Sequence, residues 1–587
     1  MRSKPKPSRA HSSDWSKFTR GGLLLAILLV ASTAATAAGR GKIAPDLKNF
    51  PVNTDGTVDV IIQFNQTPQA RHFEAIAARG GRLRFSLQHI QGAAYRIPVK
   101  MLVWLEQHPD VAYISPDRPN KVAFDDEIPA VMADAARLQY TQLDGTGVGV
   151  AVIDSGVYDH DDLQTADYTA SRIVYSESFV AGDPSTNDTY GHGTHVAGII
   201  AGNGADSQMG YSHTYIGLAP NANIINLRVL DGNGAGSDSQ VIAAIQRAIQ
   251  LKSTYNIRVI NLSLGRNIYE SYAQDPLCQA VEAAWQAGIV VVVAAGNNGR
   301  DNSHGTDGYA TIEAPGNDPA VITVGATKTN NTPTRVDDTI ASYSSKGPTL
   351  LDHVVKPDLV APGNRIVSLE SPGSSLAIAF SSLDVSPAPV CVLGRCTIPQ
   401  GGQYLRLSGT SMATPVVAGA AALMIQQDPT LTPDTVKARM MKTAWKGYPV
   451  TSWAYDVWGF EHFSQYDVFT IGAGYLDVDA VLGSTEVATG VSLSPTATFD
   501  PTSRTATLTH PLSIAWGSSI TWGDSIVWGD SIVWGGGVVL DNSIVWGNSV
   551  VWGDTTVAAN SIVWGDSIVW GITDDDSALT FVEDGEN

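Results

Sequence analysis

Charged side chains and cysteines are both scarce in this chain of 587 residues. Only 16% of the residues are charged, and 57 acidic side chains outnumber 37 basic ones, for a formal net charge of −20. Nucleic-acid binding needs clustered lysine and arginine, so this composition argues against a nucleic-acid partner. The apolar content of 43% is sufficient for a large core, and the length predicts two to four structural units.

Long apolar runs are also missing, apart from one short run from Leu23 to Val30. That run is shorter than the roughly 20 residues of a membrane-spanning helix. Several basic residues precede it, and small residues with an Ala35-Thr36-Ala37 site follow it. This order predicts a cleaved signal peptide over residues 1–38 and a secreted, extracellular protein with no stable membrane span once mature. An uncleaved membrane anchor is the alternative.

The three cysteines allow at most one disulfide within the chain. Cys391 and Cys396 flank a four-residue segment that reads as a tight turn, so a local disulfide between them is expected in an exported protein. Cys278 is left over in an amphipathic helical stretch, where a buried free thiol is expected.

Residues 45–120, hereafter the N-terminal unit, show alternating strand and helix patterns. Strands are predicted near 58–64, 83–85, 94–97 and 111–114, and helices over 69–79 and 99–107. This β-α-β-β-α-β order is typical of a small ferredoxin-like α+β domain.

Residues 130–482 form the large unit, in which apolar strands alternate with helices. Strands are predicted at 148–153, 224–230, 259–264, 289–295 and 321–324, with helices over 240–251 and 277–287. Continuous apolar strands between helices indicate an α/β fold whose parallel sheet is covered by helices on both faces. Sites in such sheets form beyond the carboxyl ends of the strands, which is where Asp154 and Asn297 fall.

Residues 500–575 carry a Trp-Gly hexapeptide repeat of roughly Trp-Gly-Asp-Ser-Ile-Val. A strict six-residue period marks a repeat architecture, and an even period keeps each position on one face of an extended chain. Short hairpins, a β-solenoid and disorder all remain open for this tail. The repeated tryptophans are Trp516, Trp522, Trp528, Trp534, Trp546, Trp552, Trp564 and Trp570.

Three short strings in the large unit supply a carboxylate, an imidazole and a hydroxyl. They are Val152-Ile153-Asp154-Ser155-Gly156, Gly191-His192-Gly193-Thr194-His195 and Gly409-Thr410-Ser411-Met412-Ala413-Thr414-Pro415. A serine hydroxyl becomes a nucleophile when a histidine takes its proton and a carboxylate orients that histidine. Ser411 is therefore the candidate nucleophile, His192 the general base and Asp154 the orienting carboxylate.

The order Asp-His-Ser and the residues that flank each position resemble the subtilisin-like serine peptidases, over about residues 50–482. The resemblance implies a subtilisin-like sheet, protein or peptide substrates, and a chemistry that needs no cofactor. It also implies that Asn297, in Ala294-Ala295-Gly296-Asn297, contributes to an oxyanion hole with the Ser411 backbone N–H. The N-terminal unit ends like the inhibitory propeptide of that family, which makes the enzyme's own propeptide a partner.

Substrate and metal contacts follow from the same resemblance. Ser263, Leu264 and Gly265 resemble an edge strand that pairs with extended peptides, and Ala295 and Gly296 would line the same site. Glu313 falls near the pocket for the side chain before the cut, where it either favours a basic side chain or simply faces solvent. Asp162 matches a position that often ligates calcium, so a structural calcium ion is possible.

These observations together predict a secreted serine endopeptidase, made as a propeptide-inhibited precursor. The alternative is a cell-surface or envelope binding protein in which the Trp-Gly tail is the main functional part and stacks on glycans.

Overall fold

The computed structural model describes residues 41–48, 50–121 and 139–500, with short gaps, and isolated strand segments beyond residue 500. The gaps are 209–210, 212, 304–305, 331, 333, 386–389, 393–394, 398–402, 457–458 and 489. Side chains of residues 390–397 and of those after 498 are not described either. The expected signal peptide, 1–38, lies outside the described residues, as does the expected repeat tail, 500–575, except for a few two- to five-residue strands.

The N-terminal unit folds around one antiparallel sheet with the strand order β2-β3-β1-β4. Two short helices connect the strands, so the chain follows the order β-α-β-β-α-β that the sequence pattern predicts. Alternate apolar side chains of β1 fill a core of its own, because one face of the sheet packs on the helices. The elements are β1 (Thr57–Phe64), α2 (Ala70–Ala77), β2 (Arg82–Leu87), β3 (Gly92–Pro98), α3 (Leu102–Gln107) and β4 (Val111–Pro116).

The large unit is built on an eight-stranded sheet with the order β13-β12-β11-β10-β6-β8-β7, and β14 pairs with β12. All pairs are parallel except β12 with β13, which confirms the predicted α/β fold with a mostly parallel sheet. The strands are β6 (Gly149–Asp154), β7 (Ile173–Ser178), β8 (Asn223–Arg228), β10 (Ile257–Leu262), β11 (Val290–Ala294), β12 (Ile322–Lys328), β13 (Thr339–Ile340) and β14 (Leu359–Pro362).

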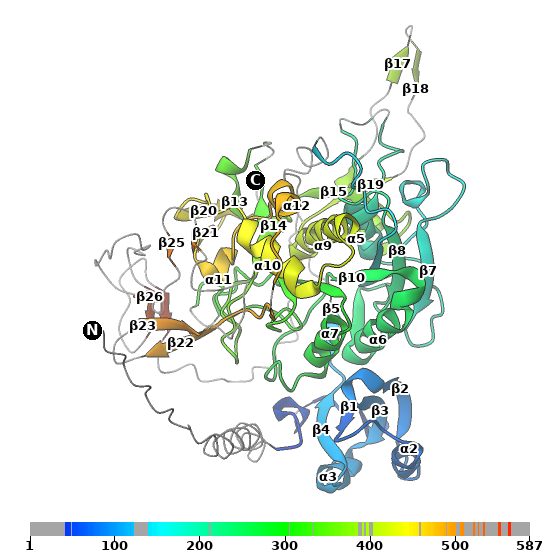
Figure 1. Ribbon diagram of the computed structural model, residues 1–587. Helices are drawn as coiled ribbons and strands as arrows, with labels where there is room; N and C mark the ends of the chain where they lie inside the picture. Colours follow the sequence, from blue (N-terminus) through cyan, green and yellow to red (C-terminus); the bar gives the residue numbers. More distant parts are fainter. Residues whose placement is uncertain are drawn as a thin grey trace, which may run out of the picture.

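Helices cover both faces of this sheet (Figure 1). α5 (His192–Ala201) and α9 (Thr410–Gln427) pack against each other on one face. α6 (Asp238–Tyr255) and α7 (Pro276–Gln286) pack against each other on the other face. α9 is buried from its first residue to Ile425, and its run of alanines and glycine allows close approach to the strands. The helix whose second residue is the candidate nucleophile is therefore a central part of the core.

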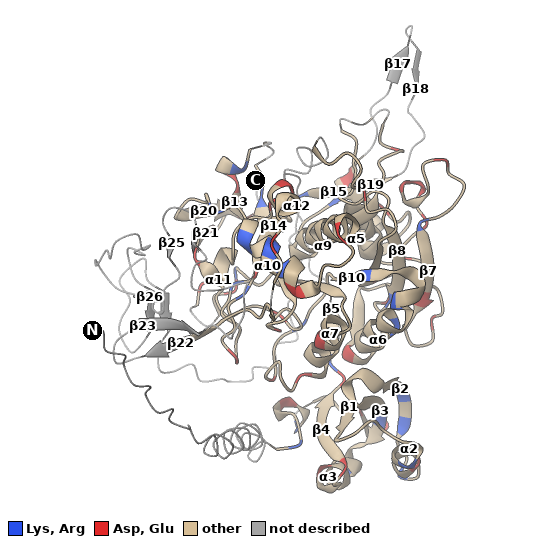
Figure 2. Cartoon of the chain, in the orientation of Figure 1, with Lys and Arg blue, Asp and Glu red and all other residues tan. Residues whose placement is uncertain are grey.

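The C-terminal part of the large unit adds α10 (Pro433–Thr443), α11 (Val468–Ile471) and α12 (Val478–Gly483), and the hairpin of β20 (Thr451–Tyr455) and β21 (Glu461–Gln465). α10 carries several basic side chains (Figure 2). One of them, Lys437, is fully buried, lies 3.1 Å from the Asp358 carboxylate and donates to main-chain carbonyls at 319–321. This contact ties α10 to the end of the sheet.

A second small sheet joins β15 (Ile366–Leu369), β16 (Asp384–Val385) and β19 (Tyr404–Leu407). Between β16 and β19, β17 (Val390–Val392) pairs with β18 (Arg395–Thr397), and this places Cys391 directly opposite Cys396. Opposed Cα atoms in an antiparallel ladder are about 4.5–5.5 Å apart, within the range that a disulfide spans. The cysteine side chains lie outside the described residues, so the disulfide stays a prediction. Cys278 is free and buried, as expected.

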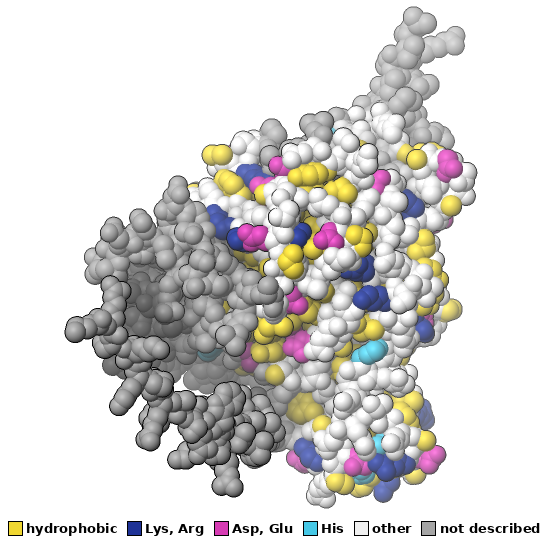
Figure 3. All heavy atoms as spheres, viewed as in Figure 1, with side chains coloured by type: hydrophobic (Ala, Val, Ile, Leu, Met, Phe, Trp, Pro, Cys, Tyr) yellow, Lys and Arg dark blue, Asp and Glu magenta, His cyan; other side chains and the backbone are white. Residues whose placement is uncertain are grey.

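The N-terminal unit lies against α6 and α7, on the face of the large unit opposite α5 and α9 (Figure 1). The Gln246 side chain of α6 donates to the Ser86 carbonyl at 3.1 Å, and Gln63 hydrogen-bonds Gln279 of α7. On the face drawn in Figure 3, basic and acidic side chains are interspersed over both units. Among the described residues, no helix has the length and apolar character needed to cross a membrane.

Candidate active site

The three predicted catalytic side chains come from three elements that end or begin at the carboxyl edge of the parallel sheet. Asp154 is the last residue of β6, His192 is the first residue of α5, and Ser411 is the second residue of α9. Because β6 occupies the middle of the sheet and the chain continues to strands on either side of it, this edge is the expected place for a site.

Asp154 and His192 form a fully buried pair. The His192 Nδ1 atom lies 2.6 Å from Asp154 Oδ1, and neither side chain is exposed. The Asp154 carboxylate also accepts the Ser155 backbone N–H at 2.8 Å. Glycine permits this approach, because a Cβ atom on Gly193 would lie 2.1 Å from the Gly156 carbonyl oxygen. The geometry fixes which imidazole nitrogen faces the carboxylate and leaves Nε2 for the substrate side.

Asp188 holds the start of α5 in place, a role that the sequence analysis did not assign. Its buried carboxylate accepts hydrogen bonds from the Gly191 N–H (2.6 Å), the Thr194 N–H (2.8 Å), the Thr194 hydroxyl (2.7 Å) and the Ser155 hydroxyl (2.8 Å). Burial raises the pKa of Asp188, and these four donors oppose that shift. Asp188 thus links the segment after Asp154 to the helix that starts with His192.

His195, three residues after His192, has a packing role. Its Nε2 atom lies 2.9 Å from the Ile366 carbonyl and 3.0 Å from the Leu405 carbonyl. Burial lowers the pKa of His195 to about 3, so this imidazole stays neutral at ordinary pH. It fastens α5 to β15 and β19 and takes no part in proton transfer.

Ser411 lies beside the chain that follows β10. The Ser411 hydroxyl donates to the Ser263 carbonyl at 3.0 Å, and the Ser263 hydroxyl donates to the Ser411 carbonyl at 2.8 Å. Gly409 precedes the helix with a φ of 147°, which only glycine adopts readily. Backbone N–H groups in a first helical turn have no partner within the helix, so the N–H of Ser411 can bind an anionic oxygen.

Asn297 follows β11 and is oriented by the residue before the nucleophile. Its Oδ1 atom accepts the Thr410 backbone N–H and the Thr410 hydroxyl, both at 2.9 Å. A backbone N–H can only donate, so the side-chain oxygen must face Thr410 and the amide nitrogen must face the other way. That Nδ2 atom is buried and has no hydrogen-bond partner among the described residues. An N–H donor that is fixed in position and free of other partners can stabilise a negative charge that develops on a substrate oxygen during a reaction.

The predicted substrate residues lie in two chain segments around Ser411. Ser263, Leu264 and Gly265 follow β10, and Ala295 and Gly296 follow β11. β10 is a central strand between β6 and β11 and ends at Leu262, and Leu264 is buried in the core, so the pairing of residues 263–265 with an extended peptide stays a prediction. Only the backbone beyond Leu262 leaves the sheet, where Arg266 and Ala314 exchange backbone hydrogen bonds of 3.0 and 2.8 Å.

A short strand that the sequence analysis missed, β9 (Ala235–Ser237), pairs antiparallel with β5 (Pro119–Lys121) at the end of the N-terminal unit. β9 lies near the start of α5, because a Cβ atom on Gly234 would contact the Tyr190 ring. The small residues Gly232-Asn233-Gly234-Ala235-Gly236 were the available signal, since such segments let another backbone approach closely.

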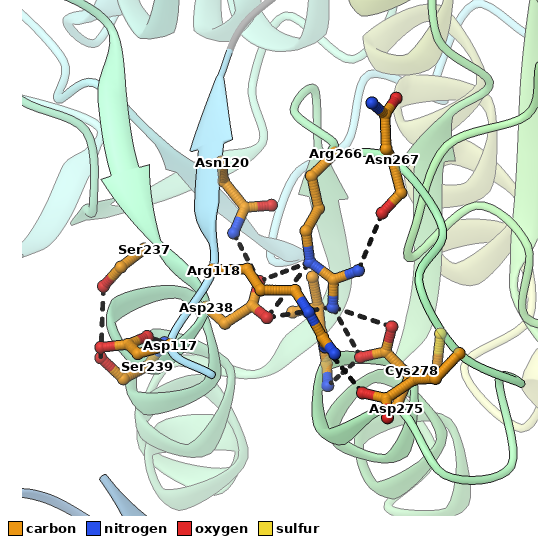
Figure 4. A network of polar contacts seen from close by, with 12 residues as sticks. Asp117, Arg118, Asn120, Ser237, Asp238, Ser239, Arg266, Asn267, Asp275 and Cys278 are labelled. Carbon is orange, nitrogen blue, oxygen red and sulfur yellow. Dashed lines mark hydrogen bonds and ion pairs between the residues drawn. The ribbon is translucent and has the colours of Figure 1, made fainter. Parts of the chain in front are cut away.

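Buried charges join the N-terminal unit to the large unit beside β9 (Figure 4). Arg118 is fully buried and donates to the Asp46 carboxylate at 2.9 and 3.0 Å and to Glu270 at 2.6 Å. The second Glu270 oxygen accepts the Tyr113 hydroxyl. Asp117 accepts the backbone N–H and the hydroxyl of Ser239, in the first turn of α6, at 2.8 and 2.6 Å.

Arg266 lies within the same network. Its guanidinium donates to Asp238 at 2.9–3.1 Å and to both oxygens of Asp275 at 2.7 and 2.8 Å (Figure 4). Asp238 also accepts the Asn120 amide of the N-terminal unit at 2.7 Å. The Arg266 side chain therefore turns toward α6 and α7, although its backbone belongs to the segment beside Ser411.

The residues around Asp162 do not fit the expected calcium ion. Asp162 Oδ1 accepts the Asp206 N–H at 2.9 Å, and Oδ2 accepts the Tyr404 hydroxyl at 2.5 Å. His160, Asp162 and Asp206 bring possible ligand atoms within 4.8 Å of one another, but calcium prefers six to eight oxygen ligands and no imidazole nitrogen.

Close to Asp162, the Arg172 guanidinium binds main-chain carbonyls that could otherwise bind a metal cation. The buried Arg172 side chain donates to main-chain carbonyls of Gln164 (3.1 Å), Ala222 (3.1 Å), Asp162 (2.7 Å) and Ala201 (2.7 Å). It thereby joins the carboxyl end of α5 to the loop after β6, as a bound ion would.

The fold and this site define a serine-type hydrolase with a subtilisin-like α/β sheet. Residues 145–479 match the subtilase family, peptidase family S8, and the chain belongs to this family of serine endopeptidases. It is 41% identical over 330 residues to serine protease AprX of Bacillus subtilis, which covers 54% of this chain and 67% of AprX. It is 34% identical over 396 residues to subtilisin E of Bacillus subtilis, which covers 65% of this chain and 84% of that protein.

A solved structure shows the same fold. Fervidolysin from Fervidobacterium pennivorans, described as a keratinolytic enzyme related to subtilisin, superposes with a TM-score of 0.54 at 20% identity. The match covers 77% of this chain and 64% of the fervidolysin chain.

Proposed function

We propose that this subtilase cleaves peptide bonds within proteins by acyl transfer to Ser411, with His192 as the general base and Asp154 as its orienting partner. The observation that carries the proposal is the buried Asp154–His192 pair, with nitrogen and oxygen 2.6 Å apart, at the sheet edge where the Ser411 helix begins. The Asn297 Nδ2 atom, which has no hydrogen-bond partner in the part of the chain that the structure describes, supports it further, because Thr410 binds the amide oxygen and orients the amide next to the nucleophile.

In the proposed mechanism, the Ser411 hydroxyl turns from the Ser263 carbonyl toward His192 and attacks the substrate carbonyl carbon. Its proton moves to His192 Nε2, and the imidazolium is stabilised by Asp154. The negative oxygen of the tetrahedral intermediate accepts hydrogen bonds from Asn297 Nδ2 and the Ser411 backbone N–H. His192 then gives the proton to the departing amine, and a water molecule repeats the sequence to release the acyl group.

We further infer that the N-terminal unit is an inhibitory propeptide. Its last strand, β5, pairs with β9 next to the start of α5, and an extended peptide bound there would reach the site by adding a strand. The buried Arg118–Glu270 ion pair and the hydrogen bond from Asn120 to Asp238 support a stable association of the two units. With the signal peptide expected over residues 1–38, we infer a secreted enzyme that stays inactive until the chain is cut between about residues 120 and 130 and the N-terminal unit dissociates.

The test compares the matured wild-type protein with the Ser411→Ala variant on casein, with a covalent serine-hydrolase inhibitor as a second readout. Wild type should digest casein and lose this activity after inhibitor treatment, whereas Ser411→Ala should retain the fold and show no digestion. Ser171→Ala, which removes a hydroxyl from an exposed serine, is the matched control and should stay active. Equal casein digestion by wild type and Ser411→Ala would overturn the assignment of the nucleophile.

A further inference from the structure

Glu313 lies between the two chain segments that flank the nucleophile. A Cβ atom added to Gly265 would lie 2.6 Å from the Glu313 Oε2 atom, and one added to Gly296 would lie 2.8 Å from its Cγ atom. The Glu313 backbone N–H donates to the Ala295 carbonyl at 3.0 Å. The side chain therefore occupies space that exists only because both neighbouring positions are glycine, and it does not simply face solvent.

Both segments also contact the catalytic residues. Gly265 comes two residues after Ser263, whose carbonyl accepts the Ser411 hydroxyl. Gly296 precedes Asn297, and its N–H donates to the Thr410 hydroxyl at 3.2 Å. Because these two segments flank Ser411 and Asn297, we expect a substrate residue whose carbonyl is held between those two to bring its side chain toward the glycines and the Glu313 carboxylate.

The Glu313 carboxylate has a neutral partner and no cationic one among the described residues. Asn298 Nδ2 donates to Glu313 Oε1 at 2.9 Å. The cation nearest in sequence to Gly265 is Arg266, and its guanidinium is bound to Asp238 and Asp275 (Figure 4). Lys346, next to Ser345 at the Gly296 segment, donates its Nζ to the Asp307 carbonyl at 3.0 Å.

We propose that Glu313 selects substrates with arginine or lysine immediately before the cleaved bond. A half-buried carboxylate without a cation gains most from a partner that supplies positive charge, and a charge-assisted hydrogen bond is about twice as strong as a neutral one. An apolar side chain entering the same space would bury the carboxylate further without compensation. This inference rests on the proposed function, because it assumes that Ser411 and Asn297 hold the reacting carbonyl.

The protonation state of Glu313 provides a signature that a structural role lacks. Burial raises the pKa of Glu313 to about 7, and the Asn298 hydrogen bond opposes that shift. The side chain is therefore neutral in mild acid and anionic above neutral pH. A pH effect on the shared catalytic steps changes the cleavage of both substrates alike and cancels in their ratio.

The experiment measures kcat/KM of the matured enzyme on peptides that differ only in the residue before the cut, arginine or phenylalanine. The arginine-to-phenylalanine ratio should exceed one at pH 8 and rise about tenfold between pH 6 and pH 8. In Glu313→Gln, which keeps the size and the Asn298 contact, the ratio at pH 8 should fall about 10- to 100-fold and lose its pH dependence. Glu486→Gln, at a carboxylate that is 59% exposed, is the matched control and should behave like wild type.

Two failures are distinguishable. If casein and the phenylalanine peptide are cleaved but the ratio is the same in wild type and Glu313→Gln, the role of Glu313 is refuted while the proposed function stands. If wild type cleaves neither peptide nor casein, the proposed function itself fails.

Discussion

Arg118 gives the sharpest test of how the N-terminal unit stays bound to the peptidase. The side chain is fully buried, and its guanidinium joins Asp46 of its own unit to Glu270 of the large unit. Glu270 is only 2% exposed in the bound state, but it loses both Arg118 and Tyr113 as partners when the unit leaves. Arg118→Met keeps much of the apolar volume and removes the charge, which leaves the Glu270 carboxylate buried without a cation.

The size of the effect follows from that uncompensated charge. Removing one partner of a buried ion pair costs about 3–5 kcal/mol. The penalty applies only to the complex, because water solvates Glu270 once the unit has dissociated. At about 1.4 kcal/mol for each factor of ten, the affinity of the N-terminal unit should fall about 100- to 5,000-fold.

The assay uses the processed protein, in which the N-terminal unit has been cut from the peptidase but remains bound. Peptidase activity is followed over a dilution series, and the concentration at which half of the activity appears gives the dissociation constant. Arg71→Met is the matched control, because the Arg71 side chain is 60% exposed and lies 3.6 Å from Asp110 within its own unit. Such surface pairs contribute about 0–1 kcal/mol, so this variant should change the constant less than tenfold.

A double variant separates charge from packing. Arg118→Met combined with Glu270→Gln should recover at least tenfold of the lost affinity, since the buried carboxylate that causes the penalty is gone. If Arg118→Met and Arg71→Met weaken the complex equally, or if the double variant is weaker than Arg118→Met alone, the electrostatic account is wrong.

Three further predictions concern the oxyanion donor, the cation site and the pH dependence of latency. Asn297→Ala should lower kcat about 10²–10³-fold with little change in KM, the magnitude known for the same kind of loss in subtilisin, and steady-state kinetics will measure it. Arg172→Met should lower the free energy of unfolding by at least about 3 kcal/mol, because four buried carbonyls lose a charged donor. Since the residues around Asp162 do not suit calcium, a chelator should leave the melting temperature of the wild-type protein unchanged. Burial raises the pKa of Asp117 to about 6 in the complex, above its ordinary value of about 3.9, so binding is accompanied by uptake of a proton. The affinity of the N-terminal unit should therefore decrease as the pH rises from about 4 to about 6 and then level off. Asp117→Asn should flatten that part of the affinity profile measured by the dilution assay. A chelator that lowers the melting temperature would contradict the prediction for the cation site. An affinity that increases over this pH range would contradict the prediction for Asp117.

Local patterns in the sequence were sufficient for the sheet and for the positions of the proposed triad. Apolar β-rich runs such as 290–294 form buried parallel strands, because such a run has a buried position on both faces of a sheet. Asp154, His192 and Ser411 stand in short strings with glycine neighbours, and the same strings place each side chain at the edge of the sheet. Each of these features depends on a few consecutive residues, so the sequence alone could indicate it.

The tertiary structure decided the contacts that depend on residues far apart in the chain. The sequence assigned no role to Asp188, and only the approach of α5 to the end of β6 gives its carboxylate four donors. Glu313 could equally have faced solvent until the two glycines beside it came together. Arg118 and Glu270 are 152 positions apart, and no local pattern relates them. The sequence by itself therefore determined which residues can perform the chemistry, because local strings set local geometry. Folding determined how those residues are held and which charged groups surround them, because the burial and pairing of a charge depend on every segment that surrounds it.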